Sequence, residues 1–248
     1  MGLLQDKIAL VTGGSRGIGR AIVFDLAAEG ADVAFTYLQN ETEAQKVIEA
    51  VRGIGQHCMA FQADVADFSR AGQIVEQVVS SWDHLDILVN NAGIHKNEPI
   101  WLMDEAHWDQ VLNANLKGAF NYLRAVAPLF RQQRAGKIVT ISSIHGLRGR
   151  EAGPNYSAAK AGVIGLSKSA ARDLGPYGVN VNVVAPGIVE TDMVRALSQE
   201  VKNGFLAQIV MGKIGQVEDV AHMVTFLCSD KARHVTGEVI KVDGGQYI

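Results

Sequence analysis

Two hydrophobic patterns alternate along this chain from its first residues, and the alternation limits the folds available to it. Residues 7–12 form a short apolar run typical of a buried strand, and residues 17–29 repeat apolar side chains at helical spacing. Gly30 then provides a stop signal for that helix. A second strand is expected at 32–37 and a second helix at 41–52. Strands and helices in alternation predict a parallel sheet covered by helices on both faces.

The same alternation continues to the C-terminus. Further strands are expected at 57–62, 86–90, 137–142, 180–185 and 238–242, with helices between them. The predicted fold class is therefore α/β, a single-domain Rossmann fold with a doubly wound parallel sheet of about seven strands. A chain of 248 residues is compatible with one domain spanning 1–248. Residues 190–217 have no strand partner in this scheme and are expected to form a substrate lid.

Composition and charge argue against several classes of function. A formal net charge of −3 argues against a dedicated nucleic-acid binder. No apolar stretch reaches the roughly 18 residues of a membrane span, and the first residues lack the order of a signal peptide. We therefore expect a cytoplasmic protein with no membrane partner. Cys58 and Cys228 are too few and too isolated for a disulfide framework or a zinc site, so no metal is expected.

A glycine-rich loop joins the first predicted strand to the first predicted helix. Glycines let a backbone turn tightly and approach a pyrophosphate, which then lies at the helix N-terminus. A structural turn is the alternative, but several glycines cluster where one would be enough. The residues predicted to bind a dinucleotide here are Gly13, Ser15, Arg16, Gly17, Ile18 and Gly19.

The end of the second strand bears on cofactor choice. NAD-selective folds usually place an acidic residue there to hold the ribose 2′-hydroxyl, whereas this strand ends at Tyr37 and no acid follows before Glu41. Arg16 could pair with a 2′-phosphate, although it could also be a solvated surface charge. The sequence thus predicts NADP(H) in preference to NAD(H), with Tyr37 among the cofactor contacts.

Two further strand ends offer candidate cofactor contacts. Asp64 and Val65 follow the third strand, where the aspartate could meet the adenine or cap the next helix. Asn91, Ala92 and Gly93 follow the fourth strand and present small side chains where a ligand would pass. Their alternative interpretation is a turn, since Asn and Gly both favour left-handed conformations.

Tyr156 and Lys160 carry the chemistry that the sequence predicts. A spacing of four places both side chains on one helix face, and an ammonium beside a phenol gives it a reason to be more acidic. A ketone that accepts a hydride develops alkoxide charge and needs a proton, which a phenol with a pKa lowered from about 10 would donate. Ser143 would hydrogen-bond the substrate oxygen, although Ser142 competes for that role. The alternative is an ordinary amphipathic helix with a solvated lysine.

Together these motifs resemble the classical branch of the short-chain dehydrogenase/reductase family over essentially the whole chain. The matching positions are 12–19, 90–93, Asn115, Ser143, Tyr156, Lys160, 186–187, Thr191 and 242–245. The resemblance implies a catalytic tetrad of Asn115, Ser143, Tyr156 and Lys160, in which Asn115 holds a water that resupplies protons through Lys160. It also implies that Pro186, Gly187, Ile188 and Thr191 bind the nicotinamide, although Thr191 could instead cap a helix.

Within the family the chain is most similar to the 3-oxoacyl-[acyl-carrier-protein] reductases. The expected activity is NADPH-dependent reduction of a 3-oxoacyl thioester to a 3-hydroxyacyl thioester. The alternatives are dehydrogenation of another secondary alcohol, such as a sugar, steroid or alicyclic compound, and a non-catalytic cofactor sensor. Arg134 matches one carrier-docking position, but Tyr177 replaces the second basic residue. Arg148 and Arg150 could compensate, hold a coenzyme A phosphate or a substrate carboxylate, or simply be solvated.

Two histidines and two long helices complete the expectations. His95 and His145 are expected to flank the site, and His145 is predicted, with Ser143 and Tyr156, to contact substrate. The family resemblance implies a homotetramer, with helices at 115–133 and 158–174 as the candidate interfaces.

Overall fold

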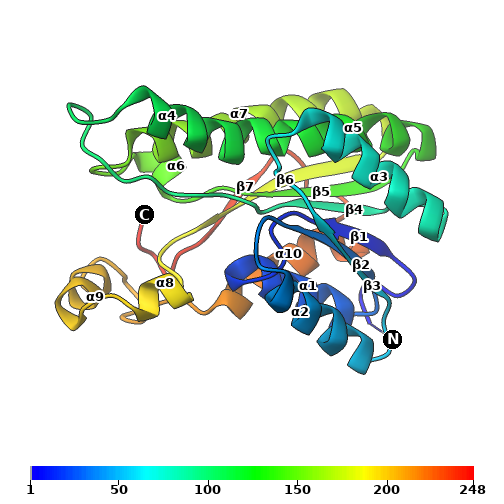
Figure 1. Ribbon diagram of the computed structural model, residues 1–248, viewed down its shortest axis with the longest axis horizontal. Coiled ribbons are helices and arrows are strands. Elements are labelled where there is room, and N and C mark those ends of the chain that lie inside the picture. The colour runs from blue at the N-terminus through cyan, green and yellow to red at the C-terminus, as the bar shows by residue number, and fades with distance from the viewer. Residues whose placement is uncertain (1) are drawn as a thin grey trace.

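The computed structural model describes residues 2–248, except for the side chain of Met193. Seven parallel strands form one sheet in the order β3-β2-β1-β4-β5-β6-β7 (Figure 1). The strands are β1 Ile8–Val11, β2 Asp32–Tyr37, β3 Cys58–Gln62, β4 Ile87–Asn90, β5 Gly136–Ile141, β6 Val179–Pro186 and β7 Val239–Val242. Each lies where the apolar runs predicted a strand, which confirms the α/β fold class.

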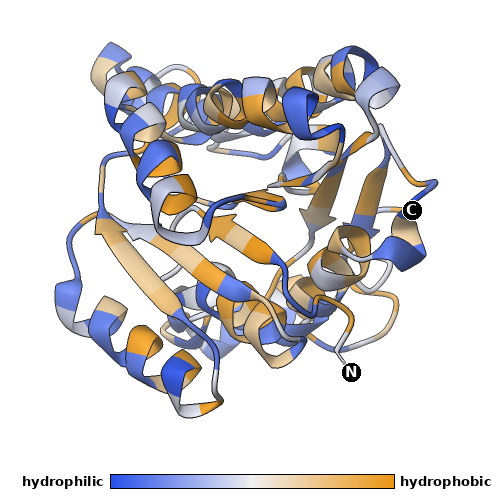
Figure 2. Ribbon diagram, turned by 90° about the vertical axis from the view of Figure 1, so that its right-hand side faces the viewer, coloured by the Kyte–Doolittle hydropathy of each residue, from blue (hydrophilic) through white to orange (hydrophobic). Residues whose placement is uncertain are grey.

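Helices cover both faces of the sheet because its strands are apolar on both sides. One layer holds α1 Gly17–Ala28, α2 Glu41–Gly53 and α10 Val217–Cys228, and the other holds α3 Phe68–Trp82, α5 Gly118–Gln133 and α7 Pro154–Leu174 (Figure 1). Two hydrophobic clusters fill the spaces between the sheet and these layers. Figure 2 shows mainly hydrophobic strands between helices of mixed hydropathy.

Several shorter elements connect the helices and strands. These are α4 Glu105–Leu112, α6 His145–Arg148, the π-helical turn η1 Asn113–Lys117 and the 3-10 turns η2 Gly175–Tyr177 and η3 Asp230–Ala232. The helix predicted at 115–133 thus begins as a π-turn and continues as α5. The helix predicted at 158–174 begins earlier, at Pro154, because proline is well suited to the first turn of a helix. Within residues 2–248, no helix is both long enough and apolar enough to span a bilayer.

The strand order reverses between β1 and β4, which creates the crevice in which such folds bind ligands. Val11 of β1 pairs with Val89 of β4, so the loops that follow these strands begin side by side. The loops after β5 and β6 emerge at the same edge of the sheet, because all the strands are parallel.

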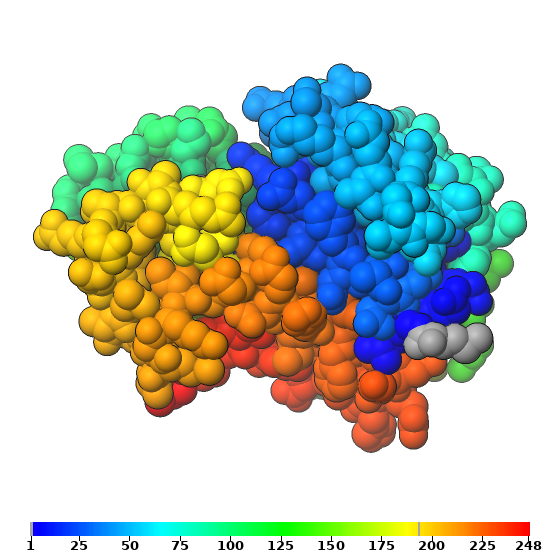
Figure 3. All heavy atoms as spheres, turned by 90° about the horizontal axis from the view of Figure 1, so that it is seen from below, coloured from blue at the N-terminus to red at the C-terminus, as the bar shows by residue number. Residues whose placement is uncertain are grey.

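Residues 190–217 contain two short helices, α8 Asp192–Arg195 and α9 Gln199–Leu206. An isolated parallel bridge between Val189 and Gly215 closes the base of this segment. Figure 3 shows it in yellow and gold at one end of the molecule. Its role as a substrate lid stays a prediction.

Candidate active site

The glycine loop is shaped by contacts that exclude side chains. Gly13 has a φ of +69°, a left-handed conformation that favours glycine. A Cβ on Gly19 would lie 2.1 Å from the Gly13 carbonyl oxygen, so the start of α1 packs directly against the loop. Arg16, the N-cap residue of α1, makes no side-chain capping bond, and the first turn carries no acidic residue. The amides of this turn are thus suited to an anion such as a pyrophosphate.

Asn91 fastens the loop after β4 to the glycine loop. Its Nδ2 donates to the carbonyl oxygens of Thr12 at 2.9 Å and Gly13 at 3.1 Å. The Thr12 hydroxyl in turn accepts from the backbone amides of Asn91 at 3.0 Å and Ala92 at 3.1 Å. The side chain of Asn91 is therefore engaged by the protein, and any contact of Asn91, Ala92 or Gly93 with a cofactor stays a prediction.

The remaining predicted cofactor residues lie around the same crevice. Asp67, and not Asp64, caps α3, with its Oδ1 accepting from Arg70 N at 2.9 Å. This leaves Asp64, next to Val65, in the turn at the end of β3, where its Oδ1 accepts from Ala66 N.

The segment after β6 also faces the glycine loop. Thr191 precedes α8 without a side-chain capping bond, and its Cγ2 lies 3.8 Å from the position of a Cβ on Gly17. The C-terminal segment holds the backbone at 186–188, because Ile188 N donates to Gln246 Oε1 at 2.9 Å. The crevice fits a dinucleotide, since its glycines leave space for a close approach and its helix amides remain available to phosphate.

The four predicted tetrad residues converge at the carboxyl edge of the sheet. Ser143 follows β5, Tyr156 and Lys160 lie on α7, and Asn115 lies in the π-turn before α5. Each is buried, with exposed fractions from 2% for Asn115 to 8% for Tyr156. Lys160 Nζ donates to the Ile141 carbonyl oxygen at 2.7 Å and lies 5.8 Å from the centre of the Tyr156 ring.

Asn115 is held by two hydrogen bonds to one backbone unit. Its Oδ1 accepts from Ile94 N at 2.8 Å and its Nδ2 donates to Ile94 O at 3.0 Å. A Cβ on Gly93 would lie 3.2 Å from Asn115 Oδ1 and 3.6 Å from Lys160 Nζ, so Gly93 leaves room between the loop and these groups. The π-turn that carries Asn115 is a rare element often found at functional sites.

The two candidate serines have different partners. Ser142 Oγ donates to the Lys160 carbonyl oxygen at 2.8 Å, so this hydroxyl fastens β5 to α7. Ser143 Oγ accepts from His145 N at 3.1 Å, and the Ser143 hydroxyl acts to lower the pKa of Tyr156 against the effect of burial. This geometry supports Ser143, and not Ser142, as the hydroxyl next to the phenol.

Burial has opposite effects on the phenol and the ammonium. It raises the pKa of Tyr156 to about 12, although the Ser143 hydrogen bond and the charge of Arg150 act in the other direction. Burial also lowers the pKa of Lys160 to about 8. In the protein alone, burial therefore outweighs the opposing effects of Ser143 and Arg150 on the pKa of Tyr156, and acidification of the phenol by Lys160 with a bound nicotinamide stays a prediction. The pKa of Lys160, in contrast, is brought closer to neutral pH.

Both predicted flanking histidines contact the Tyr156 ring region. The His95 ring centre lies 4.1 Å from that of Tyr156 with 30° between the planes, and the His145 ring stands edge-on at 6.5 Å. Burial and the charge of Arg150 lower the pKa of both imidazoles, so both are neutral near pH 7. Arg148 instead bonds Gln246 O at 3.4 Å and Gln208 Oε1 at 3.2 Å.

Sequence reasoning did not single out Asn155. This residue is fully buried beside Tyr156, and its Nδ2 donates to Lys96 O at 3.1 Å and His107 O at 3.2 Å. No sequence signal marks it, because both acceptors are backbone carbonyls about fifty residues away.

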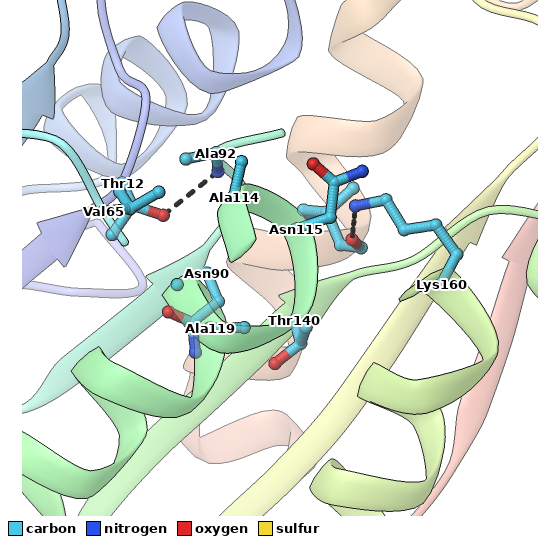
Figure 4. Close-up of a pocket in the computed structure, with 11 residues that line it drawn as sticks. Thr12, Val65, Asn90, Ala92, Ala114, Asn115, Ala119, Thr140 and Lys160 are labelled. Carbon is cyan, nitrogen blue, oxygen red and sulfur yellow. Dashed lines mark hydrogen bonds between the residues drawn. The ribbon is translucent and has the colours of Figure 1, made fainter. Parts of the chain in front are cut away.

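A small enclosed space lies below the tetrad, between the π-turn and the sheet (Figure 4). Asn115 and Lys160 line one end, and Asn90 and Thr140 the other. Within residues 2–248, the side-chain amide of Asn90 and the hydroxyl of Thr140 are buried without a protein hydrogen-bond partner. The space is too small for a water molecule, so these polar groups stay without a partner among the described residues.

The fold and this site define a class of protein. The family model described as Enoyl-(Acyl carrier protein) reductase matches residues 13–246, and the chain belongs to the short-chain dehydrogenase/reductase family of NAD(P)-dependent oxidoreductases. Among curated relatives, the 3-oxoacyl-[acyl-carrier-protein] reductase FabG of Staphylococcus aureus (strain Mu50 / ATCC 700699) is 47% identical over 244 residues, covering 98% of this chain and 99% of the relative. FabG of Escherichia coli (strain K12) is 43% identical over 244 residues, covering 98% of each chain.

Proposed function

We propose that the protein reduces a 3-oxoacyl thioester to a 3-hydroxyacyl thioester with NADPH. The observation that carries this proposal is a buried phenol, Tyr156, whose pKa is influenced by the nearby Ser143 and which lies beside Lys160 at the edge of a dinucleotide crevice. The names of the relatives support the acyl substrate.

The hydroxyls of Ser143 and Tyr156 have different roles at the substrate oxygen. When bound in the crevice, a nicotinamide cofactor supplies the hydride. Ser143 donates a hydrogen bond to the ketone oxygen, and Tyr156 transfers its proton as negative charge develops there. A phenol whose pKa is raised to about 12 keeps its proton at neutral pH, as the acid in a reduction must. His145 contacts the substrate from α6.

Lys160 and Asn115 replace the transferred proton. An ammonium with a pKa near 8 releases a proton more readily than an ordinary lysine. Asn115 holds the loop at Ile94 and, through the π-turn, positions a water next to Lys160.

Arg16 underlies the preference for NADP. It is exposed at the N-terminus of α1, and within residues 2–248 it takes part in no ion pair. Residues 38–40, directly after Tyr37, carry no carboxylate that could hold a ribose 2′-hydroxyl, and Asn40 caps α2 with its side chain. A 2′-phosphate would instead meet the guanidinium.

The proposed partner is an acidic acyl carrier protein. The guanidinium carbons of Arg131 and Arg134 lie 5.0 Å and 5.8 Å from the centre of the Tyr177 ring. Two exposed arginines thus lie over the ring of Tyr177. Together they compensate for the basic residue that the family has where this chain has Tyr177.

We also propose a cytoplasmic homotetramer. Phe68 and Phe120 stack with ring centres 6.3 Å apart on α3 and α5, yet they remain 52% and 42% exposed. Such a pair suits an interface between copies. Light scattering coupled to size exclusion measures the assembly, and a monomer would refute this part of the proposal.

The decisive experiment follows NADPH oxidation with acetoacetyl groups on coenzyme A and on acyl carrier protein. Crotonyl thioesters and unactivated cyclic ketones serve as comparisons. We expect turnover of both acetoacetyl substrates, with a lower KM for the carrier-protein form. Activity on the crotonyl or cyclic compounds alone would overturn the proposed substrate.

A further inference from the structure

A three-residue segment connects Asn115 to the helix that carries Tyr156. Its first residue, Ile94, is bound through both backbone groups to the side chain of Asn115. The carbonyl of its last residue, Lys96, accepts a hydrogen bond from Asn155 at 3.1 Å. The backbone on each side of His95 is therefore fixed by a buried side chain, one of them next to Tyr156 in sequence.

His95 uses this fixed backbone to pack on the phenol. The ring centres lie 4.1 Å apart at 30°, a close, tilted stack in which one face of Tyr156 is covered. The rest of the imidazole is exposed to the cleft. Val111 and Ala159 form a small hydrophobic cluster with Tyr156, so they and His95 surround the ring.

Burial first, and then the charged neighbours, keep this stack uncharged. Crowding by the surrounding atoms, Arg150 and Lys160 all lower the pKa of His95. The imidazole is therefore neutral near pH 7 and takes no part as an acid there. Its contact with Tyr156 is one of shape and ring packing.

We propose that His95 is a positioning residue, which holds the Tyr156 ring so that its hydroxyl stays beside Ser143 and the reacting oxygen. The proposal rests on the proposed role of Tyr156 as proton donor. Without the imidazole, the ring face opens to the cleft and the phenol samples orientations that do not reach the substrate. Only the fraction of molecules with the correct orientation then transfers a proton.

Two substitutions separate ring packing from other roles. His95→Gln keeps polarity and removes the ring, whereas His95→Phe keeps a ring and removes the nitrogens. We expect kcat for acetoacetyl-coenzyme A to fall about 3- to 10-fold in His95→Gln, as the loss of an aromatic pair suggests, with KM nearly unchanged. His95→Phe should restore most of kcat. The exposed His234→Gln variant controls for the loss of a histidine elsewhere.

Each kinetic result decides the proposal. A wild-type kcat in His95→Gln, or an effect confined to KM, would overturn positioning in favour of simple substrate contact. A His95→Phe variant as slow as His95→Gln would show that the nitrogens act in the reaction.

A measurement without substrate keeps this inference separate from the proposed function. Fluorine NMR of fluorotyrosine-labelled protein resolves five tyrosines, and Tyr156→Phe identifies the signal of Tyr156. We expect His95→Gln to shift and broaden that signal and His95→Phe to leave it sharp. An unchanged signal in His95→Gln would refute the positioning role even if the enzyme reduced no thioester.

Discussion

The tetrad and the segment at 190–217 are built in opposite ways. Tyr156 and Lys160 lie on a helix of 21 residues whose inner face is buried, and hydrogen bonds within the protein hold Asn115, Ser143 and Lys160. Helix α9 has eight residues, none of them buried. Its stretch of chain is tied to the body by the Arg148 contact with Gln208, by the bridge at Val189 and by Met211 N, which donates to Gly244 O at 3.0 Å. Outside α9, Val194 and Ile209 of this segment are buried. The comparison indicates that the tetrad is preorganised, while helix α9 packs much less against the rest of the protein.

The largest effect on kcat is expected when the tetrad loses its proton donor, Tyr156. Tyr156→Phe removes the phenolic hydroxyl and keeps the ring against His95, so kcat should fall by about 10²–10⁴-fold. Cofactor binding, followed by the fluorescence of NADPH, should remain close to that of the wild type. A near-normal kcat would mean that the buried tetrad is only structural.

The next prediction concerns the lowered pKa of Lys160. Because burial lowers the pKa of Lys160 to about 8, its ammonium loses its proton as pH rises through about 8. Proton resupply to Tyr156 then fails, so kcat for reduction should decline on the alkaline side of that value. A pH profile of kcat measured with saturating NADPH tests this, and a profile that stays level past pH of about 9 would contradict it.

A smaller effect is expected at the cofactor crevice. Arg16→Gln removes the proposed partner of the 2′-phosphate, and losing one charge-assisted contact should lower kcat/KM for NADPH by about 10- to 100-fold. The kcat/KM for NADH should change little, which makes it the internal control. Equal losses with both cofactors would assign Arg16 to the shape of the loop.

The sequence predicted the sheet and the helix of Tyr156 and Lys160 better than segment 190–217, because strongly packed elements leave a clear hydrophobic pattern. Apolar runs locate strands because burial on both faces demands them, and the spacing of Tyr156 and Lys160 is a property of any helix. The π-turn at Asn115 carries no such signal, because the same residues would suit an α-helix. The direction of the Tyr156 pKa shift also depends on burial, which a spacing cannot measure.

Arg148 and Arg150 show what the sequence could not predict about the surroundings of segment 190–217. The two residues look equivalent in sequence, yet Arg148 contacts Gln208 and Gln246, 60 and 98 positions away, while Arg150 acts on the groups around Tyr156. Contacts over such separations are set by the folded chain. The roles of these arginines could therefore be separated only in the structure.

The smallest effect on kinetics is expected at the contact that Arg148 makes between segment 190–217 and the C-terminal segment. Arg148→Gln removes the guanidinium that joins Gln208 to the C-terminal segment, so the region around α9 should order less readily over a bound substrate. Since exposed polar contacts contribute little, we expect KM for the acyl substrate to rise only about 2- to 5-fold, with kcat unchanged. Gln208→Ala should have the same effect, and the double variant should add nothing further. A fall in kcat with constant KM would instead link Arg148 to the tetrad, and the separation between the preorganised tetrad and segment 190–217 would then be wrong.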